Sequence, residues 1–382
     1  MMLRIEKLSS VEAVGAVERE WDALTAGLSP YVPFRSSLWN RLWWSHFRRE
    51  SALVRDELFV HVVRDQQDRL LAVAPLMLTR RGLAAVSCIR MLQFFGADPF
   101  MTELRGPVCR PEDQHAVVDA LSARLGRSHE FDWIEWSGIQ RDAAATPDRI
   151  GLMRQHELPN YFLQLPDTWE ALKTSLPRNI KESLRKCYNS LKRDGHTFEF
   201  RAVSEPDAVD AALDRFFRLH AARAGAAEMH AHRDVFDEPR ARAFLRAFAA
   251  EMAARGQLRI FQIEIAGAVV ATRIGFLSGS ELYLYYTGYD TAWAEYSVMT
   301  TVTAEAIRWA IEQKLSIVNL SFGRDVSKTR WRPTEVSFVQ GVQLSEAWRA
   351  RLAFRAYEEA VRRLRPRPVA APPAAITSEA TA

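Results

Sequence analysis

Four cations gather around one tryptophan in the stretch NLSFGRDVSKTRWRP, residues 319–333. An apolar run typical of a buried strand comes first, a glycine follows, and the charges come last: Arg324, Lys328, Arg330 and Arg332 around Trp331. Loops after strands often carry function, because the rigid sheet holds them in place. A local basic patch of this kind predicts an anion-binding site. The alternative interpretation is a solvated basic loop.

A second set of cations lies on a helix predicted within residues 168–194. One face of this helix is apolar and the opposite face is basic: Ile180, Leu184, Cys187 and Leu191 against Arg178, Lys181, Arg185 and Lys192. The chain has only seven lysines, and four of them fall between residues 173 and 192. The basic face predicts either a track for a phosphate-bearing substrate or an RNA end, or an ordinary solvated surface. On the apolar face, Cys187 is expected to be an inert core residue.

A third candidate is the start of the helix predicted over residues 297–313. It follows a strand predicted over residues 281–290, and Ser297 is a suitable N-cap. The first turn of a helix, which here includes Val298 and Met299, offers free backbone N–H groups and a partial positive charge. Both features suit a pyrophosphate, although many helices start this way without binding anything.

The histidines of RLHAARAGAAEMHAHRDVF, residues 218–236, give little support for a metal site. His230 and His232 form a His-x-His pair, but no nearby cysteine or carboxylate completes a ligand set, so we expect no metal. His220 lies late in a predicted helix and precedes Arg223, which is typical of a helix-end residue rather than a base. The sequence contains no Gly-x-Ser-x-Gly elbow, Walker loop or Gly-x-Gly-x-x-Gly fingerprint, so hydrolase, phosphate-loop and dinucleotide chemistries lack support.

The composition indicates a folded chain of two domains rather than a nucleic-acid coat. The 382 residues exceed a typical domain, 48% are hydrophobic, and 51 basic residues nearly balance 47 acidic ones. Three scattered cysteines suit a reducing compartment, and no apolar run approaches the ~18–20 residues of a membrane span. We therefore expect a cytoplasmic protein without a membrane span, and a disordered Pro- and Ala-rich tail at residues 366–382.

Hydrophobic periodicity predicts the same order of elements twice. The first half runs strand, strand, RMLQFFGAD (90–98), helix, FDWIEWSG (131–138). The second runs strand, strand, LYLYYTGYD (282–290), helix, SIVNLSFG (316–323). Unless two hairpins resemble each other by chance, this repeat predicts an α/β (α+β) fold of two domains, residues 1–158 and 159–365, each a mixed sheet flanked by helices.

The second half resembles the acetyltransferase domain of the GNAT superfamily, in the branch of CelD-type proteins from cellulose and exopolysaccharide loci. This branch is related to FemABX-like peptidyltransferases, which contain two GNAT-like domains in tandem. The resemblance is carried by SLPRNIKESLRK (175–186), RLHAARAG (218–225), AGAVVATRIGFLSGSELYLYYTGYD (266–290) and NLSFGRDVSKTRW (319–331). The first half matches only through the internal repeat, so we expect a degenerate domain that packs or binds the acceptor.

The resemblance implies transfer of an acyl group from acetyl-CoA or another acyl-CoA to an amine or hydroxyl, with Lys328 at the position of a lysine in the family's loop. It implies donor contacts from Ser297, Val298, Met299, Arg324 and Arg330. Acceptor contacts are expected from Arg178, Lys181, Arg185, His220, Arg223 and Trp331. One departure concerns the donor. The family usually has Pro-Gly before the phosphate-binding helix, where this chain has EYSVM (295–299), so the backbone approaches a pyrophosphate less closely.

The transfer needs a general base that accepts a proton from the attacking amine or hydroxyl. Asp290, at the end of the third strand, is the first candidate and Glu295 the second, unless Asp290 only caps the turn that follows GYD. Tyr286 is a candidate donor to an oxyanion or a leaving thiolate, or else a packing residue of the sheet. We expect direct transfer without a cysteine intermediate.

Three functions therefore compete. The first is acyl transfer to a sugar or lipid-linked precursor of a surface polysaccharide, where the sugar rests on the resemblance alone. The second is FemABX-like aminoacyl transfer from tRNA, with the basic helix as the tRNA contact. The third is a non-catalytic tandem-GNAT scaffold of a polysaccharide synthase, which the missing Pro-Gly keeps open. Either a monomer or a homodimer fits these hypotheses.

Overall fold

The computed structural model describes residues 3–83, 86–98, 100–141, 150–225 and 233–364. The N-terminal half contains β1 (Arg4–Leu8), α1 (Val11–Ala16), α2 (Glu18–Ala26), α3 (Ser37–Phe47), β2 (Val54–Leu58), β3 (Val60–Arg64), β4 (Leu70–Ala74), β5 (Leu76–Leu83), β6 (Val86–Phe94), β7 (Val108–Cys109), α4 (Gln114–Gly126) and β8 (Trp133–Gln140). The tail at residues 366–382, which we expected to be disordered, lies outside the described residues.

The second half begins with a long strand and ends with a long helix. Its elements are β9 (Met153–Gln164), α6 (Trp169–Ser175), α7 (Arg178–Arg193), β10 (Phe198–Val203), α8 (Pro206–Ala224), α9 (Pro239–Ala254), β11 (Leu258–Ile265), β12 (Ala268–Ser278), β13 (Glu281–Tyr289), the 3₁₀ helix η3 (Thr291–Tyr296), α10 (Val298–Glu312), β14 (Ile317–Phe322), α11 (Val326–Thr329), β15 (Thr334–Leu344) and α12 (Ala350–Leu364). None of the described helices is long and apolar enough to cross a membrane.

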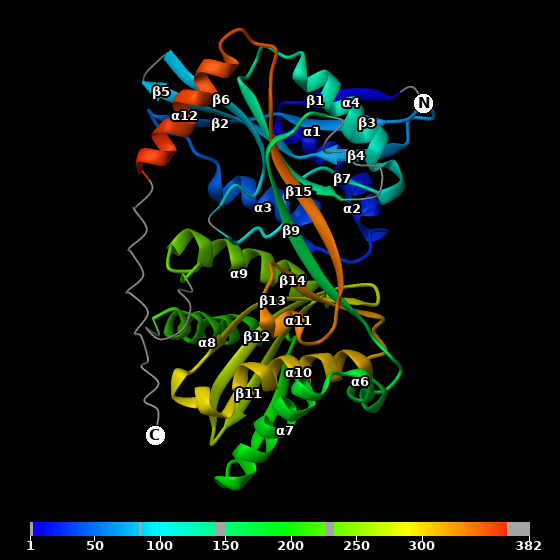
Figure 1. Ribbon diagram of the computed structural model, residues 1–382, viewed down its shortest axis with the longest axis vertical. Helices are drawn as coiled ribbons and strands as arrows, with labels where there is room; N and C mark the ends of the chain where they lie inside the picture. The colour runs from blue at the N-terminus through cyan, green and yellow to red at the C-terminus, as the bar shows by residue number, and fades with distance from the viewer. Residues whose placement is uncertain (1–2, 84–85, 99, 142–149, 226–232, 365–382) are drawn as a thin grey trace, which may run out of the picture.

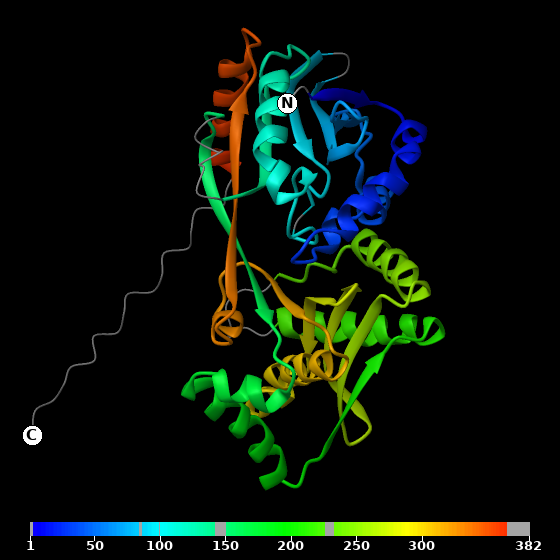
Figure 2. The ribbon, with the colours of Figure 1, turned by 90° about the vertical axis from the view of Figure 1, so that its right-hand side faces the viewer.

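One eleven-stranded sheet runs through both halves in the order β10-β11-β12-β13-β14-β9-β15-β8-β6-β5-β2. Its two longest central strands, β9 and β15, pair antiparallel with each other; β9 also pairs with β14, and β15 with β8 (Figure 1). β15 thereby returns the chain to the N-terminal half, against which α12 packs (Figure 2). The boundary expected between residues 158 and 159 falls inside β9, so the halves share strands instead of meeting at a linker.

Both halves repeat one connection. In each, two antiparallel strands lead through a helix into a parallel neighbour of the second strand: β5–β6–α4–β8 and β12–β13–α10–β14. Each parallel pair spans only three residue pairs, from Met91–Trp133 to Gln93–Glu135 and from Glu281–Ile317 to Tyr283–Asn319, and then the strands separate. The structure confirms the predicted α/β fold with an internal repeat. It adds a separate four-stranded sheet, β1-β3-β4-β7, which was not predicted.

In the N-terminal half, a chain segment packs on β8 just beyond its last pair with β6. We call this segment, Leu104–Val108, the plug. Gly106 has φ +142° and Gly138 has φ +67°, and a Cβ added at Gly138 would lie 2.1 Å from the Arg105 carbonyl oxygen. Backbones that approach this closely, at positive φ, admit only glycine. The plug therefore fills the space between the diverging strands of the first repeat.

Aromatic side chains join the two halves into a common core. The Trp39 ring on α3 makes edge-to-face contacts with Phe244 and Phe248 on α9, each at 4.8 Å between ring centroids. Phe34 meets Tyr283 of β13 edge-to-face at 5.5 Å. Such pairs contribute about 0.5–1.5 kcal/mol each beyond their buried area. The halves are thus fixed to each other by packing as well as by shared strands.

Substituting Gly138 by alanine should destabilise the protein and displace the plug. Gly151→Ala is the matched control, because Gly151 also has positive φ (+64°) but a Cβ there meets nothing within 4 Å. Both variants carry the ~1–2 kcal/mol cost of a left-handed alanine, and Gly138→Ala should lose a further ~1–3 kcal/mol from overpacking. Urea unfolding followed by tryptophan fluorescence measures the difference. Equal losses in the two variants would contradict the tight plug.

Candidate active site

A cavity of about 420 Å³ opens where β13 and β14 separate in the second repeat. β13 and the start of α10 supply Thr287 and Met299, and the loop after β14 supplies Gly323. The N-terminal half completes the wall with Phe100 and Glu103, which directly precede the plug. The site therefore depends on both halves of the chain.

The charges around this cavity are mostly positive. Two carboxylates, Glu103 and Asp325, stand against a larger set of cations: Arg223, Arg233, Arg273, Arg324, Lys328 and Arg330. The loop singled out in the sequence thus meets arginines from α8 and β12 that are distant along the chain. A concave site with this balance of charge attracts anions, because surrounding protein focuses the field.

Lys328 is held at the end of β14. Its ammonium group donates hydrogen bonds to the backbone carbonyls of Phe322 and of Gly323, the latter at 3.4 Å. Asp325 caps the short helix α11 by accepting from the Ser327 backbone N–H at 2.6 Å. Burial lowers the pKa of Lys328, and the attraction of Glu103 only partly offsets this effect.

Glu103 is a candidate functional residue of the cavity that sequence reasoning missed. Burial raises the pKa of its carboxyl group, and Lys328, the Tyr283 hydroxyl and Arg273 only partly offset the rise. Tyr283 donates a hydrogen bond to this carboxylate. A carboxyl group with a raised pKa in a cation-lined cavity has the properties of a general base. No local pattern marks Glu103, because only the fold brings it to β13.

Two neighbouring tyrosines bind the same N-terminal segment. The hydroxyl of Tyr285 donates to the Met101 carbonyl and that of Tyr286 to the Phe100 carbonyl, both at 2.6 Å. The Tyr286 ring lines the cavity, but its hydroxyl already has an acceptor. The geometry therefore fits the packing interpretation of Tyr286 better than a donor to an oxyanion.

The two carboxylates expected to act as bases lie outside the cavity lining. Asp290 accepts a hydrogen bond from the Ala292 backbone N–H at 3.0 Å and so caps η3. Glu295 is solvent-exposed on the same 3₁₀ helix. The alternative interpretation of Asp290, a residue that caps the turn, describes this geometry.

The start of α10 differs from the expected N-cap. Ser297 has φ +53°, and its side chain makes no capping hydrogen bond; its carbonyl accepts from the Thr300 N–H at 2.8 Å. Val298 is fully buried in the core, whereas Met299 and Thr300 line the cavity. Ser297 stands where the family usually has glycine and adopts a φ that favours glycine, at a cost of ~1–2 kcal/mol.

The basic face of α7 points to solvent. The Arg178 side chain is 92% exposed and pairs with Glu182 at 2.6 Å, and Arg185 is exposed. Lys181 donates to the Thr174 carbonyl at 2.8 Å. None of these three cations lines the cavity. The helix contacts the site through Ser183, which accepts from the cavity-lining Arg330 at 2.5 Å.

The predicted apolar face of α7 is confirmed. Ile180, Leu184 and Leu191 are buried in the core of the second half. Cys187 is 1% exposed, and burial raises the pKa of its thiol. Because the thiolate is the reactive form, this environment fits the expected inert core residue.

Of the remaining residues expected to contact the acceptor, two line the cavity and one is buried beside it. Arg223 lines the cavity and donates to the Thr287 carbonyl at 3.4 Å; Trp331 lines it too, but is otherwise buried. His220 is buried beside the site: its Nδ1 lies 3.2 Å from the Thr287 oxygen and its Nε2 3.7 Å from Asp234. Within the ranges that the structure describes, no three His, Cys, Asp or Glu residues form a metal site; His230 and His232 lie outside those ranges.

Comparisons with known proteins support the superfamily that the sequence resembles. Residues 178–329, about two fifths of the chain, match the family described as an acetyltransferase (GNAT) domain. FemX is similar in structure, with a TM-score of 0.53 and 10% identity over 87% of this chain and 96% of FemX. No curated protein matches the chain at a significant level.

A second solved structure is similar over both halves. It is the C-terminal domain (DUF2156) of an Agrobacterium fabrum protein that carries the provisional name lysylphosphatidylglycerol synthetase. Its TM-score is 0.50 and its identity 12%, over 91% of this chain and 96% of that domain. The matches span both repeats, so the chain shares the tandem fold of FemX. At such low identity, these structural matches show the fold alone.

Replacing Tyr283 by phenylalanine should destabilise the protein more than replacing Tyr286. Tyr283→Phe leaves the buried Glu103 carboxylate without its hydroxyl donor, which costs about 1–3 kcal/mol. Tyr286→Phe is the matched control, because the Phe100 carbonyl that it leaves is uncharged and a neutral hydrogen bond is worth about 0.5–1.5 kcal/mol. Thermal unfolding of the three proteins measures both losses. A smaller loss for Tyr283→Phe would contradict the role of Tyr283.

Proposed function

We propose that the protein is an acyltransferase whose donor binds in the cavity between β13 and β14. The observation that carries this proposal is the cavity itself, which opens at the strand divergence of the GNAT-like repeat and is lined by six cations and the half-buried Glu103. Cations in a concave site suit the phosphates of an acyl-CoA, which is the donor that the sequence resemblance implies.

The arrangement supports direct transfer to an amine or hydroxyl. The acceptor attacks the donor carbonyl and its proton passes to the Glu103 carboxylate. The bond from the acceptor atom to the acyl carbon forms as the carbon–sulfur bond breaks, and the leaving thiolate takes up the proton that Glu103 received from the acceptor. Lys328 and Arg273 both line the cavity and interact electrostatically with Glu103, so they are the candidate cations for stabilising the developing negative charge.

For the acceptor, the proposal names only a class of molecule. A sugar or lipid-linked precursor of a surface polysaccharide remains the acceptor that the sequence resemblance predicts, and the cytoplasm remains the predicted compartment. In the N-terminal half the plug fills the space that corresponds to the donor cavity, which supports one donor site per chain. That half then contributes Glu103 and Phe100 to the donor cavity instead of a second donor site.

An aminoacyl-tRNA donor is the second candidate. The exposed basic face of α7 favours it, because Arg178 and Arg185 are exposed to solvent, where phosphates can reach them. Arg330 joins α7 to the cavity through Ser183. In this case the same cavity holds the aminoacyl ester, and the tRNA 3′ hydroxyl is the leaving group.

Removing the Lys328 charge should weaken acyl-CoA binding. We expect Lys328→Ala to lose about ten- to a hundredfold in affinity, since a contact with a charged group is worth about 1.5–3 kcal/mol. Lys186→Ala is the control, because Lys186 is exposed on α7 and does not line the cavity. Calorimetric titration with acetyl-CoA, longer acyl-CoAs and CoA measures the affinities. No binding of any CoA compound would exclude this donor and leave aminoacyl-tRNA, then the scaffold, as hypotheses.

The pH dependence of transfer should identify Glu103 as the base. Its raised pKa means that the rate falls as pH drops through that pKa, because the protonated carboxyl group cannot accept a proton. Glu103→Gln should lower kcat/KM by about 10²–10⁴-fold and abolish this acid limb. Glu295→Gln, at an exposed carboxylate, is the control. Hydroxylamine serves as a generic acceptor whose own ionisation is common to all three proteins. An unchanged acid limb in Glu103→Gln would exclude this base.

A further inference from the structure

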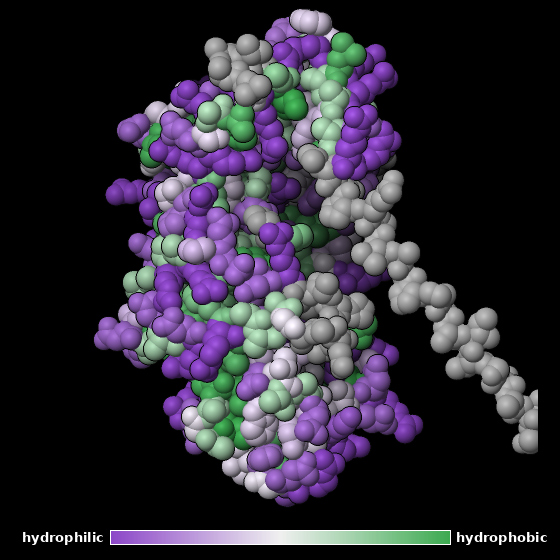
Figure 3. All heavy atoms as spheres, turned by 90° about the vertical axis from the view of Figure 1, so that its left-hand side faces the viewer, coloured by the Kyte–Doolittle hydropathy of each residue, from purple (hydrophilic) through white to green (hydrophobic). Residues whose placement is uncertain are grey.

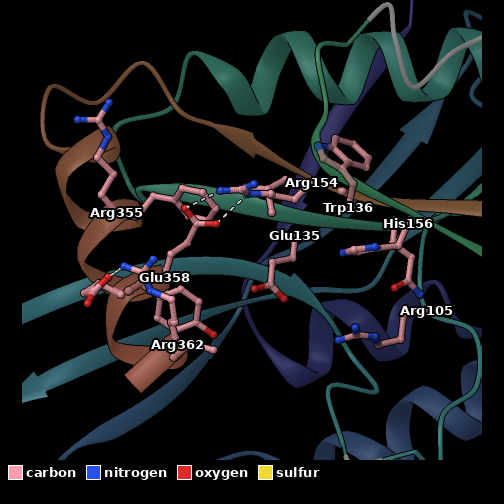
Figure 4. Close-up of a pocket in the computed structure, with 15 residues that line it drawn as sticks. Arg105, Glu135, Trp136, Arg154, His156, Arg355, Glu358 and Arg362 are labelled. Carbon is pink, nitrogen blue, oxygen red and sulfur yellow. Dashed lines mark hydrogen bonds and ion pairs between the residues drawn. The ribbon is translucent and has the colours of Figure 1, made fainter. Parts of the chain in front are cut away.

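A second cavity, of about 750 Å³, lies in the N-terminal half between α12 and the strands β8, β9 and β15 (Figure 4). It shares no lining residue with the donor cavity between β13 and β14. The side of the molecule on which α12 lies has a largely hydrophilic surface (Figure 3). A cavity of this size is within the ~300–1,000 Å³ that small-molecule sites occupy.

Several charges of this cavity are already paired and hold α12 in place. Arg154 on β9 donates to Glu358 on α12 at 2.9 Å, the pair marked by dashed lines in Figure 4. Nearer its start, α12 is anchored by the edge-to-face contact of Phe354 with Trp133, at 5.3 Å between ring centroids. The C-terminal part of α12 therefore forms one wall of a preformed cavity.

Two opposite charges in the cavity have no ion-pair partner among the residues that the structure describes. Arg105, from the plug, and Glu135, from β8, point into the same space together with His156 (Figure 4). Among the residues that the structure describes, neither Arg105 nor Glu135 forms an ion pair. Burial raises the pKa of Glu135, and the nearby Arg105 guanidinium only partly offsets the rise. A half-buried cation and carboxylate are thus both presented to one open volume.

We propose that this cavity binds a small organic anion that also carries hydroxyl groups, namely a phosphorylated sugar or a sugar acid. The Arg105 guanidinium offers the two parallel N–H donors that bind phosphate or carboxylate. Glu135 accepts from ligand hydroxyls, and His156 is positioned beside it. Arginines outnumber glutamates in the lining, with Arg105, Arg154, Arg355 and Arg362 against Glu135, Glu358 and Glu359, so a net negative ligand is favoured.

Calorimetric titration of the full chain tests this proposal with glucose 6-phosphate, glucuronate and glucose. We expect at least one of the two anionic sugars to bind and glucose not to, and the comparison of phosphate with carboxylate identifies the anionic group. Arg105→Gln should weaken binding about ten- to a hundredfold, and Glu135→Gln should weaken it several-fold. Arg351→Gln, an exposed arginine of α12 outside the cavity lining, should leave it unchanged.

The proposal does not depend on acyl transfer, and Lys328→Ala separates the two. Anionic sugars should bind this variant with unchanged affinity even where CoA compounds no longer bind. No binding of either anionic sugar would overturn the proposal, as would equal binding of glucose or unchanged affinity in Arg105→Gln. A loss of sugar binding in Lys328→Ala would also overturn it, by moving the ligand to the donor cavity. Thermal unfolding of each variant confirms that it is folded.

Discussion

The carboxylate of Asp98 organises the segment on which the rest of the structure depends. It accepts the Trp43 indole N–H at 2.8 Å and the Met101 backbone N–H at 2.6 Å, and so fixes the turn that presents Glu103 to β13. The chain then runs directly into the plug, where Gly106 packs on β8. One short segment therefore fills the opening of the first repeat and completes the cavity of the second. The two repeats therefore share one connection but differ in role, because the opening is filled in the first and forms a cavity in the second.

In the completed cavity, charged groups lie where burial disfavours their charged forms. Burial raises the pKa of Glu103 and lowers those of Lys328 and Arg273, the last to about 10. The two cations offset only part of the rise for Glu103, and Glu103 offsets only part of the fall for each cation. Removing one member leaves the others buried without compensation, which is generally more costly than the pair itself is stabilising. Such a cluster is a poor way to gain stability, and perturbed pKa values of this kind are typical of functional sites.

Local patterns in the sequence predicted local features. The repeat, the apolar face of α7 and the grouping of cations around Lys328 all follow from residues close together in the chain. Pro75 shows the limit of such patterns: it divides the apolar run of residues 70–80 into β4 and β5, which join different sheets. Glu103 and the return of β15 to β8 depend on contacts between distant residues. No periodicity records such contacts. Asp290 was chosen as a base for its place at the end of the third strand, and that place does not reveal whether a residue lines the cavity.

The first residue of the stretch NLSFGRDVSKTRWRP explains how the shared strands reach the site. Asn319 of β14 exchanges hydrogen bonds of 2.9 and 3.2 Å with Asn160 of β9, where the register of the two strands breaks. Its side-chain oxygen also accepts from the Ser321 N–H, and Ser321 has φ +76°. A buried, fully bonded amide pair tolerates little displacement. β9 also lines the second cavity, through His156, so the strand that fixes the start of the Lys328 loop is the one that reaches the proposed sugar site.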